Sequence, residues 1–235
     1  MTVVVTSLMA PSTDHLVRGL VGHLDRNGFD SLWLGGSWKE RLGAVSDGRV
    51  DVAWICGLLH VRRDTSRLPF RAVAAPVSSR PGWSGAPVYF GDLVTGPSTT
   101  AATLADLQGS TFAFNEAASL SGHGMMTDRL AALGTDLNFF ADTVRTGSHA
   151  ASIRSVAEGG ADCALIDSIL VDHVGLPHGL TVIESLGPYP APPFVIVDSA
   201  PELTAAIRAH PWLTPVAEST YDPLRRTHIR SPAAG

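Results

Sequence analysis

The chain has 235 residues and a formal net charge of −5 at pH 7, which allows one large domain or two small lobes. Hydrophobic residues make up 45% of it, as in globular and not in disordered proteins. Lys39 is the single lysine and no basic tract occurs, so nucleic-acid binding is disfavoured. No apolar run approaches the length of a membrane span, so none is expected.

The beginning of the sequence bears on localisation. Met1 and Thr2 lead directly into the apolar residues 3–5, without a charged leader or a long apolar segment. We therefore expect a cytoplasmic protein for the chain as given, and a periplasmic or extracellular one if a leader has been trimmed.

The first half of the chain alternates between apolar runs and helical periodicity. The runs predict strands at 3–6, 31–34, 50–55, 70–76 and 88–95. The periodic stretches predict helices at 14–27 and 38–46, and a short helical segment at 103–107. This alternation implies a largely parallel α/β sheet.

The second half centres on residues 112–134. An apolar strand at 112–114 is followed by a Ser/Gly turn at 119–122 and then by a helix that ends near Gly134. The remaining elements are expected as strands at 139–140, 162–166, 180–185 and 194–197, helices at 149–158, 168–174 and 201–210, a proline-rich crossing at 188–193, and a frayed basic tail from Arg225.

The Ser/Gly turn has the equipment to hold a small anion. It presents unpaired backbone N–H groups and the positive end of a helix dipole, and Ser119 and Ser121 add hydroxyl donors. The alternative interpretation is an ordinary serine N-cap that faces water.

An internal repeat indicates two similar units. The pattern G-x-x-D-x-A-x-I occurs at 48–55 and again at 159–166, although chance could also produce it. In a two-lobed chain, Cys56 and Asp167 are then equivalent residues at strand ends, where ligands bind in open α/β sheets. We expect lobe 1 to comprise 1–86 and 186–235, lobe 2 to comprise 87–185, and the hinge strands to lie near 85–95 and 180–190.

Polar or aromatic residues at strand ends and helix starts are the candidate ligand-binding residues. They are Ser7, Trp54, Cys56, Asn115, Ser119, Ser121, Gly122, His123, Thr146, His149 and Asp167. His149 and His123 can each be a surface histidine or an anion donor, and Trp54 can be a core residue or a cleft wall. Asp167 needs a partner, either a helix N-terminus or a ligand ammonium.

Known catalytic and metal-binding patterns are absent from the sequence. It contains no G-x-S-x-G, H-E-x-x-H, Walker A or strand-following G-x-G-x-x-G motif, and no His, Cys and Asp cluster with zinc spacing. No catalytic residue, metal or cofactor is therefore predicted, and enzymatic activity is an open alternative that we do not favour.

The order of motifs resembles that of the PhnD-like phosphate/phosphonate substrate-binding proteins of ABC transporters. The resemblance covers about residues 1–200. It is carried by DVAWICG at 51–57, FAFNEAASLSG at 112–122, TGSH at 146–149 and GGADCALID at 159–167. It implies the type II periplasmic binding protein fold, in which two α/β lobes close over a ligand in the cleft between them. An ABC transporter permease is the implied partner.

The same resemblance implies roles for individual residues. Ser119, Ser121, Gly122 and His149 would hold the phosphonate oxyanion. Asp167 would contact the far end of the ligand, and Trp54 would form a cleft wall.

The leading hypothesis is therefore the binding of a small, anionic solute such as a phosphonate or phosphate by hinge closure between two lobes. One alternative is a cytosolic enzyme on the same fold, with Asp167 and His149 as base and acid. Another is a ligand-sensing regulatory domain that acts through a partner. Fold does not decide among these, because one fold hosts many functions.

Overall fold

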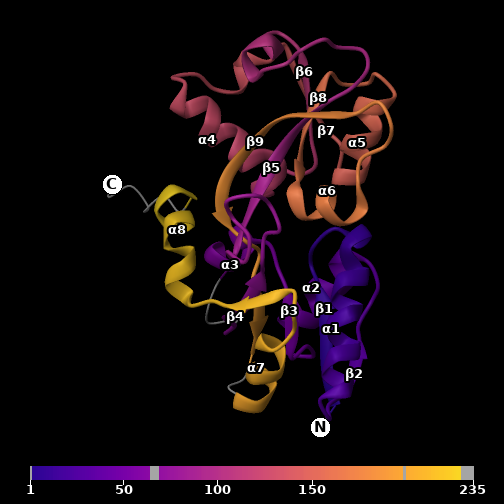
Figure 1. Cartoon of the computed structure of the whole chain (residues 1–235), viewed down its shortest axis with the longest axis vertical. Helices are drawn as coiled ribbons and strands as arrows, with labels where there is room; N and C mark the ends of the chain where they lie inside the picture. The colour runs from indigo at the N-terminus through magenta and orange to yellow at the C-terminus, as the bar shows by residue number, and fades with distance from the viewer. Residues whose placement is uncertain (1, 64–68, 198–199, 229–235) are drawn as a thin grey trace. The chain divides into compact units, whose positions relative to one another are not determined.

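The computed structural model describes residues 2–63, 69–197 and 200–228 (Figure 1). The chain divides into two compact units. Unit 1 consists of Met1–Val88 and Pro190–Gly235, and unit 2 consists of Tyr89–Tyr189. Each unit has its own β-sheet with helices packed on it, so the predicted α/β class is confirmed. The lobe boundaries and hinge strands expected from the sequence stay predictions.

Unit 1 contains a six-stranded sheet in the order β11-β4-β10-β3-β1-β2. Its strands are β1 (Thr2–Ser7), β2 (Asp30–Trp33), β3 (Val52–Trp54), β4 (Arg71–Pro76), β10 (Phe194–Ile196) and β11 (Leu213–Pro215). Its helices are η1 (Pro11–Thr13), α1 (Asp14–Arg26), α2 (Trp38–Ser46), α3 (Gly57–Arg62), α7 (Pro201–Arg208), η5 (Glu218–Tyr221) and α8 (Asp222–His228). Only the pairs that β1 makes with β2 and β3 are parallel, so this sheet is mixed and not largely parallel as predicted.

Unit 2 contains a five-stranded sheet in the order β7-β6-β8-β5-β9. Its strands are β5 (Val88–Thr95), β6 (Thr111–Phe114), β7 (Asp142–Arg145), β8 (Cys163–Asp167) and β9 (Thr181–Pro190). Its helices are η2 (Leu104–Leu107), η3 (Leu120–Gly124), α4 (Met125–Ala132), η4 (Leu137–Phe139), α5 (His149–Ala157) and α6 (Ser168–Val174). Strand β6 is parallel to β7 and β8, whereas β5 is antiparallel to β8.

The two units are built in the same way. The strand orders β2-β1-β3-β10 and β7-β6-β8-β5 each place an antiparallel strand beside two parallel pairs. The aspartates of the repeated motif also match, because Asp51 accepts a hydrogen bond from the Val4 N–H at 2.7 Å and Asp162 accepts one from the Thr111 N–H at 2.8 Å. Each aspartate therefore fixes the start of a central strand against its parallel neighbour.

The predicted strand at 139–140 is wrong. Those residues lie in and just after the short helix η4, and the edge strand β7 follows at Asp142–Arg145. The apolar residue Phe140 packs in the core without being in a strand, because its buried ring stacks on Phe112, with 4.8 Å between the ring centroids. Strand β7 is mostly exposed, so it carries no apolar run by which the sequence could have revealed it.

The proline-rich crossing was also placed too early, because β9 continues to Pro190. Strand β9 lies at the edge of its sheet, where proline is tolerated since one side of the strand needs no ladder hydrogen bonds. The short elements α3, β11 and α8 were not predicted. Arg225 lies in α8 and is not part of a frayed tail, whereas residues 229–235 of that predicted tail lie outside the described residues.

A charged cluster in unit 1 ties η5 and α8 to the sheet. Glu218 accepts hydrogen bonds from the Ala72 N–H at 2.8 Å and from Arg225 at 2.7 Å, and its carboxylate lies 3.1 Å from His60 Nε2. His60 is wholly buried and the Arg63 side chain is 6% exposed. Burial, helped by the positive charge of Arg63 and opposed by that of the Glu218 carboxylate, lowers the pKa of His60 to about 4.

Candidate functional site

The turn between β6 and α4 is held by Asn115, Ser119 and Gly122. Ser119 caps η3, because its Oγ accepts hydrogen bonds from the Gly122 N–H and from Asn115 Nδ2, both at 3.1 Å. The Ser119 hydroxyl proton is then still available for donation. Gly122 is required by close packing, since a Cβ on it would lie 1.8 Å from Asn115 Oδ1.

This turn begins a helix that runs through η3 and α4, from Leu120 to Ala132. The first N–H groups of a helix have no partner within it, and the helix dipole makes this end positive. The turn therefore directs backbone donors and partial positive charge towards the carboxyl end of β6.

Three buried side chains meet beside this turn. Ser121 Oγ lies 3.3 Å from His149 Nε2, at the start of α5, and 3.1 Å from Asp167 Oδ2, at the end of β8. Ser121, His149 and Asp167 are only 5–6% exposed. They meet because β8 pairs with β6, which leads into the turn, and because η3 and α5 both pack against β8. We call Ser121, His149 and Asp167 the Ser121 group.

The fold fixes the orientation of Asp167. Its Oδ1 accepts a hydrogen bond from the Ile169 N–H at 2.9 Å, so Asp167 is the N-cap of α6. The sequence analysis required a partner for Asp167, either a helix N-terminus or a ligand ammonium. In the structure, the N-terminus of α6 is such a partner. This arrangement also leaves Oδ2 directed at Ser121.

Burial determines the protonation of the Ser121 group. It lowers the pKa of His149 to about 4, against a small upward effect of the Leu165 carbonyl, so His149 is neutral at pH 7. Burial raises the pKa of Asp167 to about 7, with the negative charge of Asp92 adding to this and hydrogen bonds from Ile169 and Ser121 opposing it. Near pH 7, Asp167 is therefore present in both its protonated and its ionised form.

The Ser121 group contains the residue types of a hydrolase triad without its geometry. In that triad the aspartate bonds the histidine and orients it towards the serine. Here Asp167 bonds Ser121, and the buried His149 Nδ1 makes no hydrogen bond of ordinary geometry to any described side chain. Ser121 has one hydroxyl proton and two neighbours. It donates that proton to Asp167 Oδ2, so towards His149 Nε2 it is an acceptor.

Because burial lowers the pKa of His149, this residue should make the folded protein less stable at acidic pH. Its folded-state pKa lies below the ordinary 6.5, so its stabilising contribution is full above pH 6.5 and is lost as the pH falls towards 4. The raised pKa of Asp167 acts oppositely, with stability lost as the pH rises from 3.8 to about 7.

His149→Gln should therefore lose less stability than the wild type between pH 6.5 and 4.5, by on the order of 2 kcal/mol. Thermal melts across this range check it, with His178→Gln as a control because His178 is an exposed histidine of the same unit. Equal pH slopes for wild type and His149→Gln would contradict the prediction.

Two further predicted residues of unit 2 have other partners. The Thr146 hydroxyl lies 2.7 Å from Ser152 Oγ and donates to the Phe114 carbonyl at 3.1 Å, so Thr146 fixes the loop before α5. His123 is half-buried against the Phe114 ring, 4.9 Å between centroids, and burial lowers its pKa. Their part in ligand binding stays a prediction.

The predicted residues Ser7, Trp54 and Cys56 belong to unit 1. Ser7 is buried at the end of β1, and Cys56 is partly buried at the start of α3. Trp54 is wholly buried and stacked on Phe194, with 5.5 Å between the ring centroids, and its indole N–H donates to the Pro192 carbonyl, which fits the core interpretation. The roles of all three in a ligand site stay predictions.

Asp92 is a polar residue near the site that the sequence reasoning missed. It is wholly buried in β5, accepts a hydrogen bond from Ser185 Oγ at 2.6 Å, and raises the pKa of Asp167. An aspartate inside the apolar strand Val88–Thr95 was the signal that could have revealed it.

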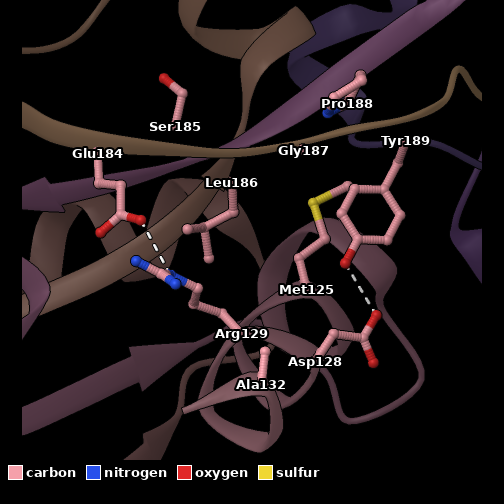
Figure 2. Close-up of a pocket in the computed structure, with 10 residues that line it drawn as sticks. All are labelled: Met125, Asp128, Arg129, Ala132, Glu184, Ser185, Leu186, Gly187, Pro188 and Tyr189. Carbon is pink, nitrogen blue, oxygen red and sulfur yellow. Dashed lines mark hydrogen bonds and ion pairs between the residues drawn. The ribbon is translucent and has the colours of Figure 1, made fainter.

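A separate depression of about 430 Å³ lies between α4 and β9 (Figure 2). Its charged groups are already paired, since Arg129 Nε bonds Glu184 at 3.0 Å and the Tyr189 hydroxyl donates to Asp128 at 2.9 Å. Figure 2 shows both pairs in the pocket wall, with Met125 and Leu186 as apolar neighbours. The Ser121 group is not part of this lining.

Within residues 2–63, 69–197 and 200–228, no three His, Cys, Asp or Glu side chains form a group that could hold a metal ion. None of the helices in these ranges has the length and apolar character needed to cross a membrane.

Comparison with known families decides the class of protein. A family model for the periplasmic substrate-binding proteins of phosphonate ABC transporters matches residues 34–210. The chain belongs to this family. The resemblance stated from the sequence motifs is therefore confirmed, as is the general function of substrate binding for an ABC transporter. The family is periplasmic, acts on small molecules and works with a transporter.

Solved structures confirm the type II periplasmic binding protein fold. PhnD1 from Prochlorococcus marinus in complex with methylphosphonate is 14% identical, with a TM-score of 0.75 over 96% of both chains. A binding protein of an ABC phosphonate transporter from Pseudomonas aeruginosa is 16% identical, with a TM-score of 0.71 over 96% of this chain and 85% of that one.

The aliphatic sulphonate binding protein SsuA from Escherichia coli is also similar. It is 13% identical, with a TM-score of 0.66 over 96% of this chain and 85% of SsuA. No curated protein matches the chain. At these low identities the structures establish the fold alone.

Proposed function

We propose that the chain binds a small oxyanion, a phosphonate or a close analogue, at the Ser121 group and the adjoining turn. The observation that carries this proposal is the 3.3 Å contact between Ser121 Oγ and His149 Nε2 beside the N-terminus of η3. Hydroxyl, imidazole and backbone N–H donors converge there on one small region of unit 2.

The donors suit a tetrahedral anion. Ser119 and Ser121 each bring a hydroxyl, His149 brings a ring nitrogen, and the first turn of η3 brings backbone N–H groups. Hydrogen bonds to an ionised acceptor are roughly twice as strong as neutral ones, so a few of them give useful affinity. Gly122 lets the helix start close to Asn115 and so allows the donors to converge.

Membership of the family supports delivery of this ligand to an ABC transporter permease, and with it a periplasmic location for the mature protein. The hinge closure expected from the sequence stays a prediction. Small-angle scattering with and without methylphosphonate checks it, since closure should lower the radius of gyration.

The binding site is tested by calorimetric titration with methylphosphonate. Ser121→Ala and His149→Ala should each weaken binding by about 10- to 100-fold, because a hydrogen bond to a charged group contributes about 1.5–3 kcal/mol. Ser98→Ala, which changes an exposed serine of unit 2, should bind like the wild type. Unchanged affinity in both site variants, or no binding by the wild type, would overturn the proposal.

A further inference from the structure

We infer that the binding of an oxyanion at this site is coupled to the uptake of one proton by Asp167. The inference rests on the proposed oxyanion site and concerns its regulation by pH, whichever oxyanion it takes. It follows from a count of the hydrogen-bond donors around Ser121. The ligand is then held more tightly at acidic than at alkaline pH.

Without a ligand, the hydroxyl proton of Ser121 is already in use. Ser121 Oγ lies 3.1 Å from Asp167 Oδ2, to which it donates, and 3.3 Å from His149 Nε2. A neutral imidazole can donate from Nε2, so His149 donates to Ser121 Oγ. A serine hydroxyl carries a single proton, so Ser121 has none left for an anion as long as Asp167 is ionised.

A bound oxyanion changes these hydrogen bonds. The proposed site needs donors from both Ser121 Oγ and His149 Nε2 to the ligand. The Ser121 hydroxyl must therefore rotate away from Asp167 Oδ2, which loses this donor. A buried carboxylate oxygen that has lost its donor and lies beside a second negative charge is strongly disfavoured.

The carboxylate of Asp167 is held beside the proposed ligand. Its Oδ1 caps α6 by accepting a hydrogen bond from the Ile169 N–H at 2.9 Å, so a rotation of the carboxylate would uncap the helix. Asp167 is only 5% exposed, so solvent does little to stabilise its charge. The fold therefore keeps Oδ2 next to the anion.

The charged and titratable groups around Asp167 do not supply the missing positive charge. His149, from α5, is neutral at pH 7, and His123, from η3, packs against the Phe114 ring. Asp92, from the adjacent strand β5, adds negative charge, whereas backbone N–H groups at the N-terminus of α6 oppose it. The other ionisable side chains of the elements packed against β8 are the buried phenol of Tyr89 and the exposed Arg154, Asp172 and His173.

A proton on Asp167 resolves this conflict. It comes from solvent and binds Oδ2, and the new O–H donates to Ser121 Oγ, which frees the Ser121 hydroxyl proton for the ligand. No bond of the ligand is made or broken, and His149 stays neutral. In the free protein, burial raises the pKa of Asp167 to about 7, and the charge of a bound anion raises it further. At pH 8 the proton therefore has to be taken up when the ligand binds.

The test is calorimetric titration with methylphosphonate at pH 6 and pH 8, each in two amine buffers that differ in ionisation enthalpy. The difference in binding enthalpy between the buffers gives the number of protons taken up. Asp167→Asn keeps an oxygen to cap α6 and offers an N–H to Ser121, so it mimics the protonated form at every pH. The wild type should take up about 0.9 more protons than Asp167→Asn at pH 8 and about 0.1 more at pH 6.

The affinities should follow the same linkage. The ratio of the wild-type dissociation constant to that of Asp167→Asn should rise about tenfold between pH 6 and pH 8. Protonation of the ligand itself affects both proteins and cancels in this ratio. Asp162→Asn is the matched control, because it removes a carboxylate at the other end of β8, where Asp162 bonds the Thr111 N–H. It should show the proton uptake of the wild type.

Carbon NMR of the Asp167 carboxyl group in the wild type gives a second measurement that needs no variant. At pH 8 its chemical shift should be that of an ionised carboxylate without ligand and that of a protonated carboxyl group at saturation with methylphosphonate. A carboxylate that stays ionised in the complex, or equal proton uptake by the wild type and Asp167→Asn, would overturn the inference and leave the proposed oxyanion site standing. Failure of the wild type to bind methylphosphonate at either pH would overturn both.

Discussion

Gly122→Ala is expected to remove methylphosphonate binding and to lower the stability of unit 2 by about 3 kcal/mol, a high value for an overpacked site. The added Cβ would lie 1.8 Å from Asn115 Oδ1 and 2.6 Å from Asn115 Cγ. Asn115 must move, which breaks its bond to Ser119 and displaces the start of η3. Calorimetric titration and thermal melts measure the two effects.

A rescue variant separates this clash from a general loss of folding. Asn115→Ala combined with Gly122→Ala removes the obstructing amide, so the double variant should regain most of the lost stability. Gly19→Ala is the control, because nothing lies within 4 Å of a Cβ at that helical position and alanine there favours the helix. A stable, ligand-binding Gly122→Ala would contradict the proposed structure of the turn.

Glu218→Ala is expected to destabilise unit 1 by about 2–3 kcal/mol, somewhat less than the loss of a fully buried ion-pair partner. Glu218 itself is 42% exposed, but His60 is wholly buried and Arg63 is 6% exposed, and both would lose their carboxylate neighbour. The Ala72 N–H would also lose its acceptor. Chemical or thermal unfolding measures the change.

Two comparisons keep this result interpretable. Glu218→Gln retains an oxygen for the Ala72 N–H, so it should fall between the wild type and Glu218→Ala. Asp47→Ala breaks an exposed pair with Arg49 and should change stability by less than about 1 kcal/mol. Equal effects of Glu218→Ala and Asp47→Ala would contradict the assigned role of the cluster.

The sequence predicted several elements of the fold well. Strand β5 and the helices α2 and α6 have the predicted bounds, because β5 is a long apolar run and the two helices begin at capping residues, Ser37 and Asp167. It failed where an element is short or exposed. Helix α3 and strand β11 have few residues, and the edge strand β7 has no apolar run to mark it.

The candidate site was predicted in part. The Ser/Gly turn and the T-G-S-H segment indicated Ser121 and His149, and the internal repeat placed Asp167 at a strand end. The contact of Asp167 with Ser121 was not predictable, because it depends on how η3 packs on β8. The burial of Trp54 was not decidable either, since an aromatic residue in a strand can face a core or a cleft.

The central claim is that a small oxyanion binds at the Ser121 group and the turn before α4. Its most direct test is an NMR titration of the isotopically labelled chain with methylphosphonate, following backbone amide shifts. We predict that the largest changes in unit 2 occur at residues 119–122 and at the start of α5, around His149. Changes confined to the depression between α4 and β9, or absent from the turn at saturation, would contradict the claim.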